Sequence, residues 1–397
     1  MSWKEKATYA AKVLPSYTWQ RLSRTIPDSP VHLIFALADH FEPAIDPHDG
    51  MARVSREEQV RRLEWWCREY PKRIDRFRDH DGQPFVHSYF YPAEQYDAGL
   101  IEMLADHCHA GWGEIEIHLH HGIPEPDTAE NTRRVLTEFR DALALRHQCL
   151  ALEEGSEIPK YVFVHGNFAL ANSAGGKFCG VDSEMAVLAS TGCYADMTLP
   201  TSPLHPAQTA KINSLYECTL PLDRVAPQRE GKDLRVSHQT SPDVSRTPRT
   251  FPLIVQGPLG MDFGRGGKPG IENASITQSN PLSVRRLALW KKAAVRVQGR
   301  PDWLFIKLHA HSMDPTQGEA VAGEPMRKFL EELVQGAGDR KETLHFTSAR
   351  EMVNIILAAC DGREGNPGLY RDYHFRRFRD VSRTTSAPAQ PAASVRG

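Results

Sequence analysis

Three histidines close a short apolar segment, residues 114–121 (Glu-Ile-Glu-Ile-His-Leu-His-His), and they are the residues in this chain best suited to chemistry. Because side chains alternate along an extended strand, Glu116, His118 and His120 should share one face, while His121 turns to the other. Neutral imidazole is the commonest protein ligand for metals, so imidazoles that converge at the end of a strand predict a metal site.

Polar residues that could complete such a site end four other short apolar segments. They are Asp39 and His40 after the first segment, His165 and Asn167 after the fourth, Asp196 in the fifth, and His309 and His311 at the end of the last. In a parallel α/β barrel the carboxyl ends of the strands meet on one face, so we expect these side chains to surround one cleft.

Imidazole and carboxylate ligands without cysteine favour zinc, with cobalt, nickel or manganese as alternatives. A catalytic site needs about three protein ligands and one open position. The candidates are Asp39 or His40, His118, and either His120 or His121. A carboxylate beside the metal could take a proton from a bound water. A histidine on the opposite wall, such as His309, could protonate a leaving amine or alcohol.

Further side chains near the expected mouth of the cleft are candidates for substrate contacts. They are His165, Asn167, Asp196, Tyr91 and His311. Tyr91 could stack on the apolar face of a sugar ring. Asn167 and Asp196 could bind hydroxyl groups or hold the tautomer of a histidine. Ordinary packing of the ring and local turn hydrogen bonds are the structural alternatives.

The elements that must position these residues alternate short apolar segments with helical patterns, which predicts βα units and a mostly parallel sheet. The seven expected strands are residues 31–38, 85–91, 114–120, 161–165, 193–199, 251–256 and 303–309. Helices are expected to begin near Ser55, Asp127 and Ser348, each followed three residues later by Glu, and to cover residues 183–190, 282–297 and 325–335. This alternation favours a distorted α/β barrel of seven βα units over an open sheet.

Three parts are expected along the chain. Residues 1–30 form a helical lead-in, and residues 31–362 form the barrel, with a long insertion at 221–250 that is rich in Arg, Pro, Ser and Thr. Residues 363–397 are a C-terminal extension, which we expect to be disordered from about residue 383 because bulky apolar residues are scarce there.

The composition limits which binding partners and which cellular location we expect for this chain. The chain has 48 Lys plus Arg against 50 Asp plus Glu, so there is no electrostatic reason to expect nucleic acid as the main partner. No apolar run is long enough to span a membrane and the start lacks a signal-peptide pattern, so we expect a cytoplasmic protein. Peripheral membrane association through the N-terminal segment is the alternative. The seven scattered cysteines form no C-x-x-C pair and are expected to be reduced and mostly buried.

The order of these motifs resembles that of the polysaccharide deacetylase superfamily, whose distorted barrels of seven βα units hydrolyse acetyl groups on sugars. In that family the first strand ends Thr-Phe-Asp-Asp, in which the first Asp is the base and the second binds the metal. Residues 37–40, Leu-Ala-Asp-His, are similar. The resemblance implies that Asp39 is the base and that His40 is a ligand.

Two further motifs extend the resemblance over most of residues 31–312. Residues 114–118 are similar to the family's Glu-Ile-Gly-Asn-His, which implies that His118 is a metal ligand. Residues 306–309, Ile-Lys-Leu-His, resemble the last motif and imply that His309 is the general acid. The chain departs from the family at Gly122, where the second metal-binding histidine should stand, and the family's Arg-Pro-Tyr is absent.

The resulting hypothesis is a metal-dependent hydrolase that removes N-acetyl or O-acetyl groups from a carbohydrate. One alternative is a glycan-binding or polysaccharide-assembly protein with a degenerate barrel, because two family motifs are incomplete. A second alternative is an amidase that acts on another small acylated substrate with the same scaffold.

Overall fold

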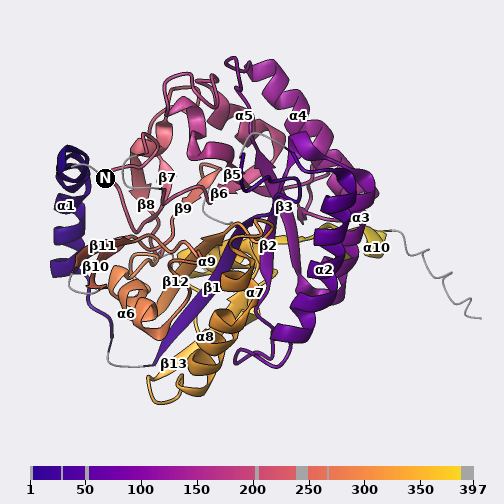
Figure 1. Ribbon diagram of the computed structural model, residues 1–397. Helices are drawn as coiled ribbons and strands as arrows, with labels where there is room; N and C mark the ends of the chain where they lie inside the picture. Colours follow the sequence, from indigo (N-terminus) through magenta and orange to yellow (C-terminus); the bar gives the residue numbers. More distant parts are fainter. Residues whose placement is uncertain are drawn as a thin grey trace, which may run out of the picture.

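The computed structural model describes residues 3–27, 30–49, 53–201, 205–237, 249–265 and 268–385. Within them the chain has a mixed α/β fold, in which helices flank one large and mostly parallel sheet (Figure 1). Most of the expected disordered tail and the middle of the expected insertion lie outside these residues.

In the described part of the chain, ten strands form the large sheet. Their spatial order is β12 (Trp303–Ala310), β1 (Val31–His40), β2 (His87–Pro92), β3 (Gly113–Leu119), β5 (Tyr161–His165), β6 (Cys193–Asp196), β9 (Leu253–Val255), β7 (Leu215–Cys218) and β8 (Gly231–Asp233), with β13 (Glu342–Thr347) also beside β1. The pairs from β12 to β9 are parallel, whereas β7 runs antiparallel to both β9 and β8. All seven expected strands exist, but the described sheet ends at β12 and β8, so a closed barrel is not confirmed.

Strand β1 is at the centre of this arrangement because it has three parallel partners. Residues 32–39 pair with β12, while on its other side residues 31–36 pair with β13 and residues 37–40 pair with β2. Both faces of β1 are buried, one against the apolar side chains of α9 (Ala349–Cys360). This double burial explains why the strand reads as a continuous apolar run.

The helices surround the sheet. They are α1 (Trp3–Ser23), α2 (Arg56–Ile74), α3 (Ala98–His107), α4 (Ala129–Asp141), α5 (Glu184–Thr191), α6 (Val284–Ala293), α7 (Gly318–Ala322), α8 (Glu324–Gln335), α9, and α10 (Phe378–Thr385). The helix starts expected at Ser55 and Ser348 are confirmed, since each hydroxyl accepts a backbone N–H three residues later. Sequence reasoning missed the helices α3, α7 and α10 and the strands β7, β8 and β13. It also missed two small antiparallel pairs, β10 (Gly260–Arg265) with β11 (Lys268–Glu272) and β4 (Ala151–Glu153) with β14 (Phe375–Arg377).

The two ends of the described chain are helical. Helix α1 lies at one edge of the molecule (Figure 1), where Val13 packs on Ile212 and Leu259. Helix α10 continues to Thr385, and the rest of the tail that we expect to be disordered lies outside the described residues. No helix in the described ranges combines the length and the apolarity needed to cross a membrane.

Candidate functional site

A cavity of about 550 Å³ opens beside the carboxyl ends of the parallel strands. Its lining includes His40, Glu42, Glu94, His120, Asn167 and His311. These residues follow the ends of β1, β2, β3, β5 and β12, so parallel pairing brings together side chains from five distant parts of the chain. This is the arrangement expected of a catalytic face in an α/β fold.

The deepest part of this site is a group of possible metal ligands, His40, Glu42 and His118, whose ligand atoms all lie within 4.8 Å of one another. His40 ends β1, Glu42 lies two residues later, and His118 comes from β3. The ring centroids of His40 and His118 are 4.9 Å apart. Two imidazoles and a carboxylate are a donor set suited to a divalent transition metal.

The hydrogen bonding of His118 shows which of its nitrogens is available. Its Nδ1 lies 2.7 Å from the carbonyl oxygen of Val164, and because a carbonyl only accepts, Nδ1 carries the proton. Burial lowers the pKa of His118, and so does the nearby His120, so the ring is held neutral with a lone pair on Nε2. That Nε2 is buried without a hydrogen-bond partner, although Oε1 of Glu42 is 3.3 Å away. Two acceptors this close call for a cation between them, which fits a metal ion.

Burial and neighbouring imidazoles also keep the rings of His40 and His309 uncharged. Burial lowers the pKa of His40 well below its usual value, and His311 and His118 lower it further. The ring centroids of His40 and His311 are 4.5 Å apart, and those of His40 and His309 are 6.4 Å apart. Burial likewise lowers the pKa of His309, whose Nδ1 has no hydrogen-bond partner. Neutral imidazole is the form that binds metals.

His120 is oriented by a carboxylate that sequence reasoning missed. Glu94 lies in the turn after β2, and its Oε1 is 2.9 Å from Nδ1 of His120. The backbone N–H of His120 donates to Oε2 of the same residue at 3.2 Å. Burial opposes a positive charge on His120, but Glu94 and Glu42 raise its pKa above the usual value. The two hydrogen bonds to Glu94 fix the orientation of the His120 ring. Its Nε2 faces Glu42 at the edge of the cavity, 3.7 Å from Oε1.

Asp39 turns to the opposite face of β1, where its carboxylate is fully engaged. Oδ2 lies 2.9 Å from Nδ1 of His87 and accepts the hydroxyl of Ser312, while Oδ1 accepts the backbone N–H of Ser312 at 2.9 Å. The side chain of Asp39 thus ties the segment after β12 to β1. Among the described residues, those that line the cavity do not include Asp39.

The remaining candidates from the sequence divide between the cavity and the protein interior. Asn167 and His311 line the cavity, whereas His121 and His165 meet in a second, fully enclosed group with Cys179 and Glu184. Asp196 is buried and bonded to Thr198, and the hydroxyl of Tyr91 donates to the carbonyl of Gln95. In the structure Asp196 and Tyr91 are both buried, and neither is among the described residues that line the cavity.

Strand alternation could have revealed Glu42, since it lies two residues after His40 and so on the same side. Glu94 and Glu184 carried no such signal, because their places depend on loops. Cys179, which lies in the second group, was not singled out from the sequence either.

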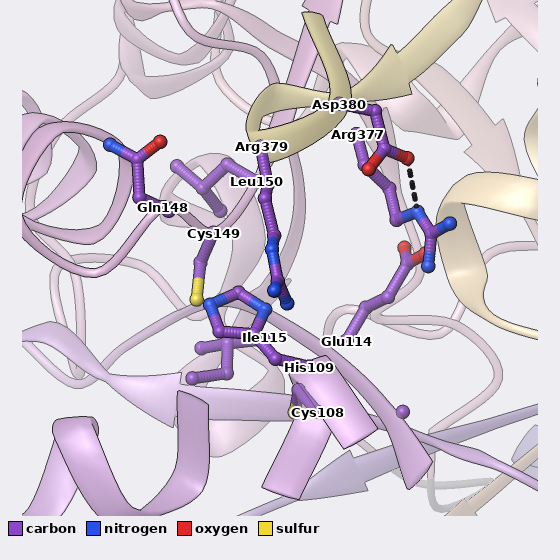
Figure 2. Close-up of a pocket in the computed structure, with 11 residues that line it drawn as sticks. Cys108, His109, Glu114, Ile115, Gln148, Cys149, Leu150, Arg377, Arg379 and Asp380 are labelled. Atoms are coloured by element: carbon purple, nitrogen blue, oxygen red, sulfur yellow. Dashed lines mark hydrogen bonds and ion pairs between the residues drawn. The ribbon is translucent and has the colours of Figure 1, made fainter. Parts of the chain in front are cut away.

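Two other features of the structure are poorer candidates. A cavity of about 250 Å³ lies at the amino end of β3, beside Glu114 and Arg377 (Figure 2), whereas catalytic groups of such folds gather at carboxyl ends. A third possible ligand group contains Asp79, Asp81 and His345. Arg371 lies 3.0 Å from both aspartates, so a guanidinium already supplies the positive charge.

The chain matches no protein-family model, and no curated protein matches it. The functional assignment therefore rests on the residues and geometry described above.

Proposed function

We propose that this protein is a metal-dependent hydrolase that removes acetyl or other acyl groups from a carbohydrate, on a distorted barrel of the polysaccharide deacetylase type. The observation that supports it most is the unpartnered Nε2 of His118, close to Glu42 and beside an open cavity. Zinc fits the donor set of His40, Glu42 and His118, and three protein ligands leave a position for water.

A divalent ion held by His40, Glu42 and His118 would supply a water with a lowered pKa and a positive charge beside the acyl oxygen. Around it, His120 is placed to accept a proton at Nε2, because Glu94 holds its other nitrogen. This assigns to the His120–Glu94 pair the proton-accepting role that the family resemblance implied for Asp39.

The opposite wall is suited to the leaving group. Burial lowers the pKa of His309 and keeps its ring neutral, so we assign the proton for a departing amine or alcohol to His120, which has taken one from the water. His311 and Phe168 both contact His40, and with Asn167 they form a wall that combines aromatic surface with hydrogen-bonding groups. Such a wall suits a sugar ring, which has apolar faces and polar edges.

The test is elemental analysis of protein purified without a metal-affinity tag, followed by an acetate-release assay on acetylated amino sugars and glycans. We expect His118→Ala to lose one metal equivalent and all acetate release. Full turnover by a His118→Ala protein that lacks this metal would refute the mechanism. Sugar binding that is insensitive to chelators, with no product formed, would favour the glycan-binding alternative.

A further inference from the structure

The second enclosed group of possible ligands lies where three segments of the chain meet. His121 follows β3, His165 ends β5, Glu184 begins α5, and Cys179 comes from the loop between β5 and α5. Their ligand atoms all lie within 4.8 Å of one another. The residue exposures are 8% for His121 and 0% for each of the others, so the group is closed to solvent.

The outer nitrogens of both imidazoles are occupied by acceptors. Nδ1 of His121 lies 2.8 Å from Oδ2 of Asp127, and Nδ1 of His165 lies 2.5 Å from the carbonyl oxygen of Gly166. Because a carboxylate and a carbonyl only accept, both Nδ1 atoms carry protons, and in the neutral rings both Nε2 atoms have lone pairs that point inward. Outer hydrogen bonds of this kind are typical of metal-binding histidines.

The inward-facing atoms of this group all lie at hydrogen-bond distance from one another. The two Nε2 atoms are 3.1 Å apart, and Oε1 of Glu184 is 2.8 Å from Nε2 of His121 and 3.1 Å from Nε2 of His165. A single proton satisfies only one of these contacts, whereas protons on both rings would oppose each other. A cation at the centre satisfies all three acceptors, and Cys179 adds a fourth ligand.

We propose that His121, His165, Cys179 and Glu184 bind a structural zinc ion that fixes the loop at residues 166–183. One thiolate, two imidazoles and a carboxylate form a donor set that zinc accepts, and four protein ligands leave no open position for substrate. The group is therefore a closed, structural centre and not a second reaction centre.

The loop has a backbone that needs such an anchor. Asn167, Phe168, Ala171, Asn172 and Phe178 all have φ between 50° and 64°, a region that side chains other than glycine rarely adopt. The loop also contributes Asn167 and Phe168 to the wall of the open cavity. A metal held by Cys179 and Glu184 thus shapes the cleft without touching its contents.

The close approach of Gly122 to the loop gives independent support. Gly122 has φ of 66°, and a Cβ atom there would lie 2.3 Å from the carbonyl oxygen of Cys179. A histidine cannot occupy this position while Cys179 stays in place. The departure from the deacetylase motif at residue 122 is thus accompanied by a new ligand set built from the neighbouring residue, His121.

The experiment is metal analysis and cobalt substitution of the full chain. We expect two zinc equivalents per chain in the wild type and, after exchange, a thiolate-to-cobalt charge-transfer band in the near ultraviolet. Cys179→Ala should lose one equivalent and the band, whereas Cys360→Ala, which removes another buried cysteine, should keep both.

A variant of the cleft site distinguishes a failure of this proposal from a failure of the proposed function. His118→Ala should lose the other equivalent and keep the band. A wild-type cobalt protein without a thiolate band would overturn the second site, and so would a Cys179→Ala protein that keeps all of its metal. If Cys179→Ala does not fold, the presence or absence of the thiolate band in the wild-type cobalt protein still tests the second metal site.

Discussion

Arg350 provides a test of what holds the end of β3 opposite to His118. Its side chain is 2% exposed; Nη2 lies 2.7 Å from Oε1 of Glu114, and Nη1 lies 2.6 Å from Oδ1 of Asp372. Nη1 also donates to the carbonyl oxygen of Phe375 at 2.8 Å. Arg350→Met keeps the aliphatic stem but leaves the largely buried carboxylate of Glu114, 18% exposed, without its partner.

Removal of one partner from a buried ion pair costs about 3–5 kcal/mol, because the other charge stays buried and uncompensated. Asp372 is 55% exposed, so water can take the place of Arg350 beside it. The loss of this second ion pair therefore adds little to the free-energy cost. Since the entropy of unfolding is about 2.1 cal/mol/K per residue, a chain of this length loses roughly 1 °C of melting temperature per kcal/mol. We therefore expect the melting temperature of Arg350→Met to fall by roughly 4–6 °C, with metal content unchanged.

The assay is thermal unfolding followed by circular dichroism, with elemental analysis of the same samples. Arg377→Met is the matched control, because its partner Asp380 is 51% exposed and the pair should contribute little. Glu114→Gln combined with Arg350→Met should recover part of the loss, since no buried charge remains unpaired. A fall no larger than that of the control, or strictly additive effects in the double variant, would refute this account of the buried pair.

Three further predictions concern the cleft and the core. Glu94→Gln removes a charge-assisted hydrogen bond worth about 1.5–3 kcal/mol from His120, so kcat/KM for an acetylated sugar should fall roughly 10–100-fold with metal content unchanged; an unaltered kcat/KM would deny His120 a part in turnover. Asp39→Asn should lower the melting temperature and retain the metal, because the carboxylate holds Ser312; loss of metal would place Asp39 at the centre after all. Burial raises the pKa of Asp196 from 3.8 to about 7, so the folded protein holds a proton that the unfolded chain releases, and stability should fall as the pH rises between these values. Asp196→Asn should lack this fall, and thermal melts at several pH values check it; identical pH profiles for variant and wild type would contradict it.

Local patterns predicted much of the fold. The seven expected strands exist because each is a short apolar run buried on both faces, and the helices after Ser55 and Ser348 begin at their capping residues. Strand β13, Glu-Thr-Leu-His-Phe-Thr, was missed although its polar and apolar residues alternate, because it has only two strongly apolar residues and lies close after a helix. Closure of the sheet was not predictable from periodicity, since it depends on how distant edges approach one another.

The candidate site was only partly predictable for the same reason. Alternation along β3 separates His118 and His120, which approach Glu42, from His121, which approaches Glu184. No pattern indicated that Cys179 would join the second group, because a loop of irregular backbone brings it there.

The sequence by itself determined which residues could do chemistry and on which face of each strand they stand, because alternation is a local property of an extended chain. Only the tertiary structure decided which carboxylate each histidine meets. Asp39 is turned to Ser312, and Glu42, Glu94 and Glu184 are brought to the imidazoles by parallel pairing and by loops. Contacts between residues far apart in the chain arise from packing, and the spacing of residues along one segment does not encode them.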